Sequence, residues 1–328
     1  MNKRTLGKTG YKVSEVGFGA WAIGGSWGDV SDDDALAALR EALAQGVTFI
    51  DTADVYGDGR SEKLIAQVLK DFRGERVYVA TKAGRRIDPH VASGYVYENL
   101  AKFVARSLKN LAVGTLDLVQ LHCPPTDVYR RDAAFEALER LKTEGRIAHY
   151  GVSVETVEEA NLAVQHPGVA TVQIIYNMFR FKPALEFFDT AVANNVGVIA
   201  RVPLASGLLS GKMSKDSTFP ADDHRNFNRH GEEFDVGETF SGVDFETGVA
   251  AADDLKTIVP EGHTLAQTAL RWILMHAAVS AVIPGAKNPQ QASSNAAASD
   301  LAMLPPSTMQ KVRAVYNEKI RAQVHDRW

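Results

Sequence analysis

The chain has 328 residues, of which 45% are hydrophobic and 23% charged, and its formal net charge is -4. This composition is typical of a globular protein with a large core, and the slight acidity gives no support for binding to nucleic acid or to a membrane surface. There is no run of eighteen apolar residues, the first residues lack the apolar stretch of a secretory signal, and the single Cys123 fits a reducing compartment, so we expect a cytoplasmic protein.

Short apolar runs and helical patterns alternate along the chain. The apolar runs cover residues 15–20, 47–51, 77–82, 116–122, 147–153, 170–177, 196–202 and 280–285. Their lengths and their β-branched residues predict buried strands. Helical patterns are clearest at residues 32–46, 132–145, 156–166 and 183–195. Eight strands that alternate with helices predict a parallel sheet closed into a (β/α)8 barrel, which we interpret as one domain over residues 1–328.

Three further segments refine this architecture. Residues 4–13 resemble a hairpin around "GKTG" that would close the lower end of the barrel. A doubly wound sheet is the competing fold, but "GFGAWAIGG" lacks the G-x-G-x-x-G spacing of its phosphate turn, and we expect no helix directly after it. Segment 203–247 shows little periodicity and follows the seventh strand. We therefore expect a long functional insertion at the C-terminal face, where barrel enzymes have their sites.

Polar residues stand at the C-terminal ends of three consecutive expected strands. Asp51 ends the second strand, Lys82 the third and His122 the fourth, and Tyr56 follows in the loop after the second. Each of them alone has an ordinary explanation, as a helix cap, a surface charge or a packing residue. Because parallel strands point the same way, all four side chains are expected to meet at one mouth of the barrel, which favours a catalytic site.

This set of residues suits the reduction of a carbonyl group. A phenol holds its proton up to a pKa of about 10, and a nearby ammonium group lowers that pKa. Asp51 would keep Lys82 charged and in place, and His122 would orient or polarise the substrate oxygen. Tyr56 is then expected to give its proton to the carbonyl oxygen as hydride reaches the carbon.

The same residues carry a resemblance to a known family. "DTADVYG", Lys82 and "LVQLH" resemble the Asp-Tyr-Lys-His tetrad of the aldo-keto reductase superfamily, and the resemblance extends from "LGKTGYKVSEVGFGAW" to "IPGAKNPQQASSN". The phrases "PLASGLLSGK" and "IPGAKNPQQ" are similar to those of bacterial members near the potassium-channel β-subunit branch. The resemblance implies a barrel enzyme that uses NADPH to reduce aldehydes or ketones, and it implies no metal.

The resemblance also implies where the cofactor and the substrate bind. The nicotinamide end matches Gly19, Ala20, Trp21, Ser153, Gln173 and Arg201. The pyrophosphate matches the loop residues Pro203, Leu204, Ser206, Gly207, Leu209, Lys212 and Arg225. The adenosine half matches Gly285, Lys287, Gln291 and Asn295, with Lys287 placed to meet the 2′-phosphate of NADP. The substrate is expected to be a small carbonyl compound in a pocket lined by Trp21 and Trp27.

Several of these positions have a second interpretation. Ser153 and Gln173 are equally well explained as a strand-end serine and a buried glutamine, and Arg225 as a solvated loop arginine. Arg201 stands where relatives carry a tyrosine that stacks on the nicotinamide. A planar guanidinium either stacks there in the same way or turns away to pair with an acid of segment 203–247.

Three more departures concern the cofactor. Val154 stands where many relatives carry an asparagine, so one contact to the carboxamide is expected to be absent. Gly285 and Gln291 replace the Lys and Arg that bind the 2′-phosphate in other branches. The preference for NADP over NAD therefore depends on Lys287.

Two rival functions belong to other classes. A lysine at a barrel strand end is also the nucleophile of Schiff-base lyases, which makes Lys82 a candidate for covalent chemistry. The resemblance to channel β-subunits also permits a non-catalytic NADP-binding regulatory subunit. The intact tetrad argues against this second alternative.

Overall fold

The computed structural model describes residues 1–25 and 27–328. Eight parallel strands form one sheet in the order β10-β9-β8-β7-β6-β5-β4-β3. They are β3 (Phe18–Gly19), β4 (Phe49–Asp51), β5 (Tyr78–Ala83), β6 (Leu116–His122), β7 (Ile147–Ser153), β8 (Val169–Ile175), β9 (Gly197–Arg201) and β10 (Val279–Val282). Each strand overlaps one of the apolar runs, so the predicted alternation is confirmed.

The sheet closes on itself along a seam between its first and last strands. Three backbone hydrogen bonds of 2.8–2.9 Å cross this seam, from Gly17 N to Val282 O, from Gly19 N to Pro284 O and from Val282 N to Glu15 O. Gly19 leaves no room for a side chain, because a Cβ atom there would lie 2.6 Å from Ile283 O. The closed sheet with its surrounding helices is the (β/α)8 barrel that the sequence predicts.

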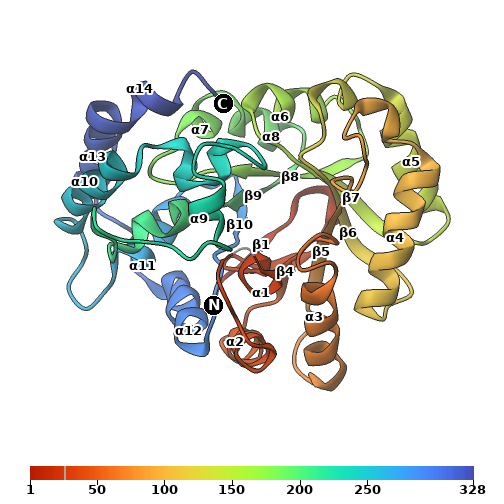
Figure 1. Ribbon diagram of the computed structural model, residues 1–328, viewed down its shortest axis with the longest axis horizontal. Coiled ribbons are helices and arrows are strands. Elements are labelled where there is room, and N and C mark those ends of the chain that lie inside the picture. The colour runs from red at the N-terminus through yellow and green to blue at the C-terminus, as the bar shows by residue number, and fades with distance from the viewer. Residues whose placement is uncertain (26) are drawn as a thin grey trace.

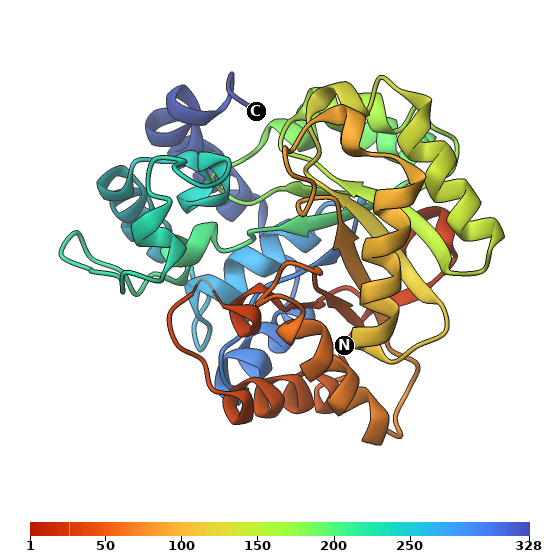
Figure 2. The ribbon, with the colours of Figure 1, turned by 45° about the vertical axis from the view of Figure 1, so that its right-hand side comes forward.

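Helices surround the barrel on its outside (Figures 1 and 2). They are α2 (Asp32–Ala44), α3 (Arg60–Asp71), α4 (Tyr97–Leu111), α5 (Asp132–Thr143), α6 (Val157–Ala163), α7 (Lys182–Glu186), α8 (Phe188–Ala193), α11 (Leu265–Leu274), α12 (Pro289–Ala296), α13 (Pro306–Val315) and α14 (Arg321–Val324). The single turn α1 (Trp21–Gly24) follows β3 directly, where no helix was expected. None of the helices in the described part of the chain has the length and apolar character needed to span a membrane.

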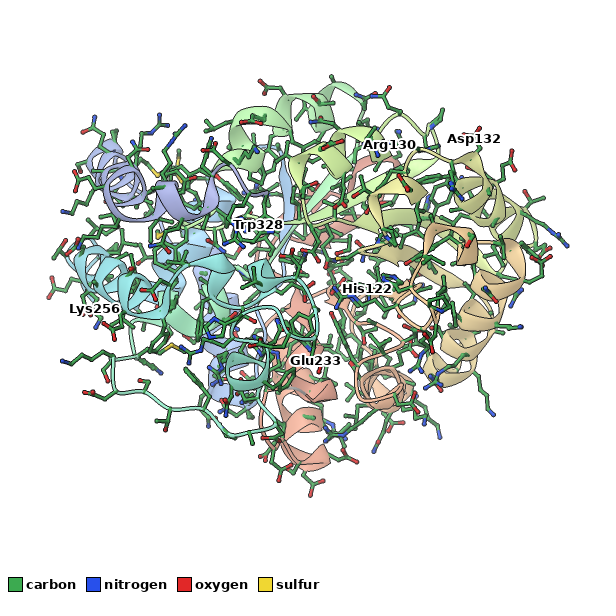
Figure 3. The ribbon with its side chains drawn as sticks, turned by 45° about the horizontal axis from the view of Figure 1, so that its top comes forward. His122, Arg130, Asp132, Glu233, Lys256 and Trp328 are labelled. Carbon is green, nitrogen blue, oxygen red and sulfur yellow. The ribbon has the colours of Figure 1, made fainter. Side chains whose placement is uncertain are left out.

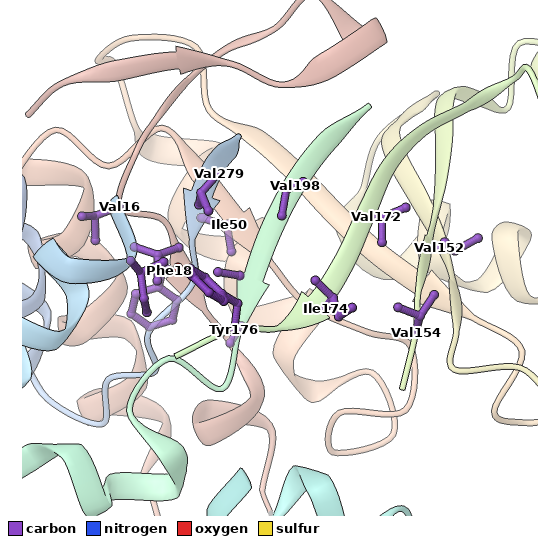
Figure 4. Close-up of a cluster of buried hydrophobic side chains, with 14 of the residues drawn as sticks. Val16, Phe18, Ile50, Val152, Val154, Val172, Ile174, Tyr176, Val198 and Val279 are labelled. Carbon is purple, nitrogen blue, oxygen red and sulfur yellow. The ribbon is translucent and has the colours of Figure 1, made fainter. Parts of the chain in front are cut away.

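The apolar core has two layers, because side chains of a strand alternate between its two faces. The larger layer lies between strands and helices, and Figure 4 shows some of its members, such as Val172 and Ile174 on β8. The smaller layer fills the barrel interior and includes Leu6, Val13, Phe49, Leu118 and Ile199.

A hairpin closes the lower end of the barrel. Its strands β1 (Lys3–Thr5) and β2 (Lys12–Ser14) pair antiparallel. Leu6 and Val13 reach from this hairpin into the interior layer, and both are fully buried. Gly7 lies so close to the start of β9 that a Cβ atom would fall 2.1 Å from Gly197 N.

The insertion after β9 is ordered and lies at the C-terminal face. It contains the 3-10 turns Ala205–Ser210, Val236–Glu238 and Phe240–Gly242 and the helix α9 (His224–Phe227), and α10 (Phe245–Lys256) follows. Leu208 and Phe240 of this segment are each 1% exposed. Figure 3 shows His122 of β6 in the centre of the molecule, where the strand ends meet.

Candidate active site

The Lys82 ammonium group joins the ends of β4 and β5 to the loop that carries Tyr56. Its Nζ atom donates hydrogen bonds to Asp51 Oδ2 (2.5 Å), to Thr52 O (2.9 Å) and to Tyr56 Oη (3.3 Å). An ammonium group has three N–H donors, so all of them are used. The Tyr56 oxygen accepts a hydrogen bond from Lys82, and its own proton is therefore left to point elsewhere.

Burial and the neighbouring opposite charge act in opposite directions on the pKa values of Tyr56 and of Lys82. Burial raises the pKa of Tyr56, and the opposing effect of Lys82 does not cancel it. The net pKa of Tyr56 is thus raised, whereas the lysine alone was expected to lower it. Burial lowers the pKa of Lys82, but Asp51 and Tyr56 outweigh it, so the net pKa is raised. At neutral pH the site holds a protonated phenol beside a charged ammonium group.

His122 stands next to the phenol. The rings of Tyr56 and His122 meet edge to face with their centroids 5.9 Å apart. Burial, followed by the charges of Arg85 and Lys82, holds the pKa of His122 well below its usual value. Its Nδ1 atom is buried and has no hydrogen-bond partner among the described residues. His122 is therefore a neutral imidazole, and its Nδ1 atom can still form a hydrogen bond.

Two glutamines hold Asp51 from the other side. Gln120 Nε2 and Gln173 Nε2 donate to Asp51 Oδ1 at 3.1 and 2.7 Å. The structure therefore places Gln173, expected at the nicotinamide carboxamide, inside the network that orients Lys82. Gln120 was not identified from the sequence, although it lies two residues before His122 and so shares its face of β6.

Two arginines clamp the loop on which Tyr56 sits. Arg86 donates to Asp54 O (2.8 Å), to Asp54 Oδ2 (3.1 Å) and to Asp58 Oδ1 (2.5 Å). Arg106 donates to the same carboxylate of Asp58 at 2.6 Å. Because Asp54 and Asp58 flank Tyr56 in sequence, these bonds fix the path of the backbone that presents the phenol.

A cavity of about 280 Å³ opens over Tyr56 and His122. It is lined by Trp21, Gly25, Val55, Tyr56, Gly57, Arg85, His122, Phe234 and Glu238. Trp21, predicted to line the substrate pocket, does so and stacks with Tyr56 at a centroid distance of 6.2 Å. Trp27 is not among the lining residues. Its ring meets Trp21 edge-on at 5.4 Å and also contacts His224 at 4.4 Å.

Arg201 is held by carboxylates of the barrel and of the insertion. Its Nη2 atom donates to Glu155 Oε2 (2.7 Å) and Val154 O (3.0 Å), and its Nη1 atom lies 3.2 Å from Glu238 Oε1. Arg85 Nη2 donates to the same Glu238 oxygen at 2.7 Å. Of the two arrangements considered for Arg201, the structure shows pairing with acids, one of them in segment 203–247.

The other residues expected at the nicotinamide lie at the strand ends. Ala20 N donates to Asp51 O at 2.8 Å, which joins the end of β3 to the tetrad. Ser153, at the end of β7, lies with its Oγ 3.5 Å from Cys123 Sγ. Burial raises the pKa of Cys123 to about 12, so this thiol stays protonated and is a packing residue.

The residues expected at the pyrophosphate form the first turns of the insertion. Ser206 donates to Glu238 O (3.0 Å) and accepts from Phe240 N (3.0 Å), so it holds the insertion together. Pro203 and Leu209 are buried, Leu204 and Gly207 are partly exposed, and Lys212 is exposed. Arg225 forms a two-pronged ion pair with Asp223 (2.8 and 2.6 Å) and lies 5.0 Å from the Trp27 ring centre.

The residues expected at the adenosine half gather at the start of α12. Lys287 donates through Nζ to Trp27 O and through its backbone N to Gln291 Oε1 (2.8 Å). Asn295 donates to Gly285 O at 3.0 Å. Burial and then the charge of Arg225 lower the pKa of Lys287, so two cations stand close together beside the N-terminus of this helix.

The Asp51, Lys82, Tyr56 and His122 side chains thus gather at the C-terminal end of the barrel strands, where barrel enzymes have their active sites. The model of the aldo/keto reductase family matches residues 15–317, and the chain belongs to this family of oxidoreductases.

Individual relatives cover nearly the whole chain. It is 30% identical over 298 residues to the aldo-keto reductase YhdN of Bacillus subtilis (strain 168), which covers 89% of this chain and 86% of that protein. It is 29% identical over 334 residues to a probable voltage-gated potassium channel subunit beta of Arabidopsis thaliana, at 97% and 98% coverage. The structure resembles the glycerol dehydrogenase AKR11B4 from Gluconobacter oxydans, with a TM-score of 0.80, 28% identity, and 97% and 96% of the two chains covered.

Proposed function

We propose that this protein is an NADPH-dependent reductase that converts aldehydes or ketones to alcohols, with Tyr56 as the proton donor. One observation carries the proposal. Lys82 uses its three N–H donors on Asp51, Thr52 and Tyr56, so the phenol accepts from the lysine and its own proton is free for a substrate oxygen. A carbonyl oxygen that gains negative charge is the natural acceptor of that proton.

The other residues of the site prepare this transfer. Asp51 and the two glutamines that hold it fix the position of Lys82, which stays charged. The ammonium group stabilises the phenolate left behind after proton transfer, because opposite charges at this distance attract. The neutral His122 lies with its ring 5.9 Å from the phenol ring and has a buried Nδ1 atom without a hydrogen-bond partner in the described part of the chain, which suits it to orient the substrate oxygen. Together these residues supply the electrostatic preorganisation that acid catalysis needs.

The residues around α12 and the insertion fit an anionic dinucleotide. Lys287 and Arg225 are cations in a partly buried place, and Asn288 caps the N-terminus of α12, where backbone N–H groups favour a phosphate. Lys287, Arg225 and the turn Ala205–Ser210 would hold the phosphates, and Ser153 and Trp21 the nicotinamide end. When bound, the cofactor supplies the hydride for the carbonyl carbon.

The test uses the purified protein, NADPH, and a panel of aldehydes and ketones followed by NADPH absorbance. Tyr56→Phe keeps the ring and removes the proton, so kcat is expected to fall by about 10²-fold or more while NADPH affinity, measured by titration, changes little. A variant that keeps wild-type turnover would remove Tyr56 from the role of acid.

The geometry is unfavourable to the two rival functions. A Schiff-base lyase needs a neutral lysine that can reach a carbonyl, whereas Lys82 is 1% exposed, is fully hydrogen-bonded and has a raised pKa. The similarity to probable potassium channel beta subunits supports a non-catalytic regulatory subunit as the second candidate, but such a subunit has no need of an assembled proton donor. Borohydride trapping with an aldehyde is therefore expected to leave Lys82 unlabelled.

A further inference from the structure

Two charged residues of the pocket have no part in the proton transfer. Arg85 comes two residues after β5, and Glu238 ends the 3-10 turn Val236–Glu238 of the insertion. Both line the cavity that also exposes Tyr56 and His122. A pocket residue that is polar, charged and outside the reaction fixes the orientation and the identity of the ligand in most binding sites.

Arg85 and Glu238 form a direct ion pair in the cavity wall. Arg85 Nη2 donates to Glu238 Oε1 at 2.7 Å. The Arg85 side chain is 22% exposed and that of Glu238 is 6% exposed. A guanidinium has five N–H donors and a carboxylate accepts several hydrogen bonds. The pair therefore presents donors and acceptors side by side, with capacity beyond the bond between them.

The buried Arg201 and the partly buried Glu155 lie next to the pair. Arg201 lies 3.2 Å from Glu238 Oε1 and donates to Glu155. Burial raises the pKa of Glu238, but Arg85 and Arg201 outweigh it and lower the pKa to about 2, so the carboxylate is charged at neutral pH. The acids Glu155 and Glu238 lie with Cys123 in a group whose ligand atoms could reach one cation. The two arginines already occupy these carboxylates, which makes the wall an ion-pair network.

Aromatic rings form the remainder of the wall. Trp21 and Phe234 meet edge-on at a centroid distance of 5.9 Å, and the Arg85 guanidinium lies 5.8 Å from the Phe234 ring. Such rings offer flat apolar faces to the C–H side of a ligand. The pocket thus combines apolar faces with a paired donor and acceptor, which suits a ligand that has hydroxyl groups and no net charge.

We infer that Arg85 and Glu238 select neutral carbonyl substrates with several hydroxyl groups, of the aldose or ketose class. Two neighbouring hydroxyl groups of such a substrate can donate one hydrogen bond to Glu238 and accept another from Arg85. This inference rests on the proposed carbonyl reduction at Tyr56 and adds the substrate class.

The two other substrate classes fit less well. A simple aliphatic aldehyde would cover the ion pair without replacing its bonds to water, which costs free energy of desolvation. A substrate carboxylate would pair with Arg85 but would meet the Glu238 charge at the same place, and like charges at such short range repel. A site that hydrogen-bonds a substrate hydroxyl can reject the analogue without it by about 10⁴-fold.

The experiment compares three aldehydes of four carbons, with NADPH as the reductant: erythrose, butanal and 4-oxobutanoate. Rates for erythrose are corrected for its free aldehyde fraction. We expect the wild-type kcat/KM for erythrose to exceed that for butanal and for 4-oxobutanoate by about 10²-fold or more. A wild-type enzyme that reduces butanal or 4-oxobutanoate as well as erythrose would overturn the inference and leave carbonyl reduction intact. If the enzyme reduces none of the three aldehydes, both the substrate inference and the proposed carbonyl reduction are wrong.

Two variants then assign the selectivity to the ion pair. Arg85→Gln is expected to reduce the erythrose-to-butanal ratio of kcat/KM by about 10-fold or more, the scale of a hydrogen bond to a charged group. Glu238→Gln leaves the Arg85 charge uncompensated, so the 4-oxobutanoate-to-erythrose ratio should rise. Both readouts are ratios, so a general loss of folded enzyme does not move them.

Matched controls come from an exposed pair on the far helix α5, where Arg140 Nε donates to Glu144 at 3.0 Å. Arg140→Gln and Glu144→Gln should leave every ratio at its wild-type value. Unchanged ratios in Arg85→Gln and Glu238→Gln would contradict the assignment to these residues.

Discussion

Arg201 Nη2 donates a 2.7 Å hydrogen bond to Glu155 Oε2, so the guanidinium at the end of β9 is held by a carboxylate that follows β7. Burial lowers the pKa of Arg201, but Glu155 and Glu238 outweigh it and the net pKa is raised. The guanidinium of Arg201 is therefore paired with acids of the barrel and of the insertion. These two ion pairs link the end of β9 to Glu155 after β7 and to Glu238 of the insertion.

Arg201→Gln should destabilise the protein by up to about 3 kcal/mol, because Glu155 loses its 2.7 Å partner while Glu238 keeps its hydrogen bond from Arg85. Urea unfolding measures this loss. The Arg201 side chain is 8% exposed, whereas Arg140 of the control variant Arg140→Gln is 60% exposed and should change stability by less than about 1 kcal/mol. Equal midpoints for both variants would show that the pairing contributes nothing.

The pH dependence of kcat should reflect a phenol that keeps its proton. Since the pKa of Tyr56 is raised and that of His122 lowered, neither group changes its charge between pH 7 and 9. We expect kcat for reduction to be flat over this range under saturating substrate and cofactor. A fall with an apparent pKa of about 8 would mean that the phenol is more acidic than its burial allows.

Glu155 should make stability depend on pH in the opposite sense to an ordinary carboxyl group. Burial raises its pKa from 4.5 to about 7, with Arg201 opposing and Glu238 reinforcing the shift. Between these pH values the folded protein holds a proton that the unfolded chain has lost. The contribution of Glu155 to the free energy of unfolding is therefore full below pH 4.5 and declines as pH rises to 7, by at most about 3 kcal/mol.

Urea unfolding of wild type and Glu155→Gln at several pH values checks this expectation. The glutamine does not titrate, so the wild type should lose stability relative to the variant as pH rises. Above pH 4.5 the control Glu144→Gln should run parallel to the wild type, because hydrogen bonds from Tyr97 and Arg140 lower the pKa of Glu144 from 4.5 and keep it charged in this range. A constant difference between wild type and Glu155→Gln would show an ordinary pKa.

Lys287→Ala should weaken NADPH binding more than NADH binding, because NADPH alone carries the 2′-phosphate. A hydrogen bond to a charged group contributes about 1.5–3 kcal/mol, and partial exposure reduces this figure. Fluorescence titration with both cofactors measures the ratio, with Lys256→Ala as the surface control. Equal losses for the two cofactors would make Arg225 the better candidate for the phosphate.

The strands and the tetrad were predictable because each depends on local pattern. β6 and β7 begin and end at the predicted residues, since their apolar runs have clear polar flanks. Of the run 15–20 only Phe18–Gly19 forms regular strand, and the residues before it reach the last strand through the isolated bridge Val16–Val282. Arg85 and Glu238 could not be paired from the sequence. They are far apart in the chain, and Glu238 lies in a segment without periodicity.

The seam between β3 and β10 joins opposite ends of the chain, and this affects how the protein is made. At about 5–20 residues per second, β3 leaves the ribosome roughly 10–50 s before β10 can cover its edge. During that time the open edge is a template on which other nascent chains can add a strand. β3 has only two residues in regular strand geometry, which is too short for stable pairing with a foreign strand. We therefore expect the short first strand to limit pairing with other nascent chains until β10 covers its edge.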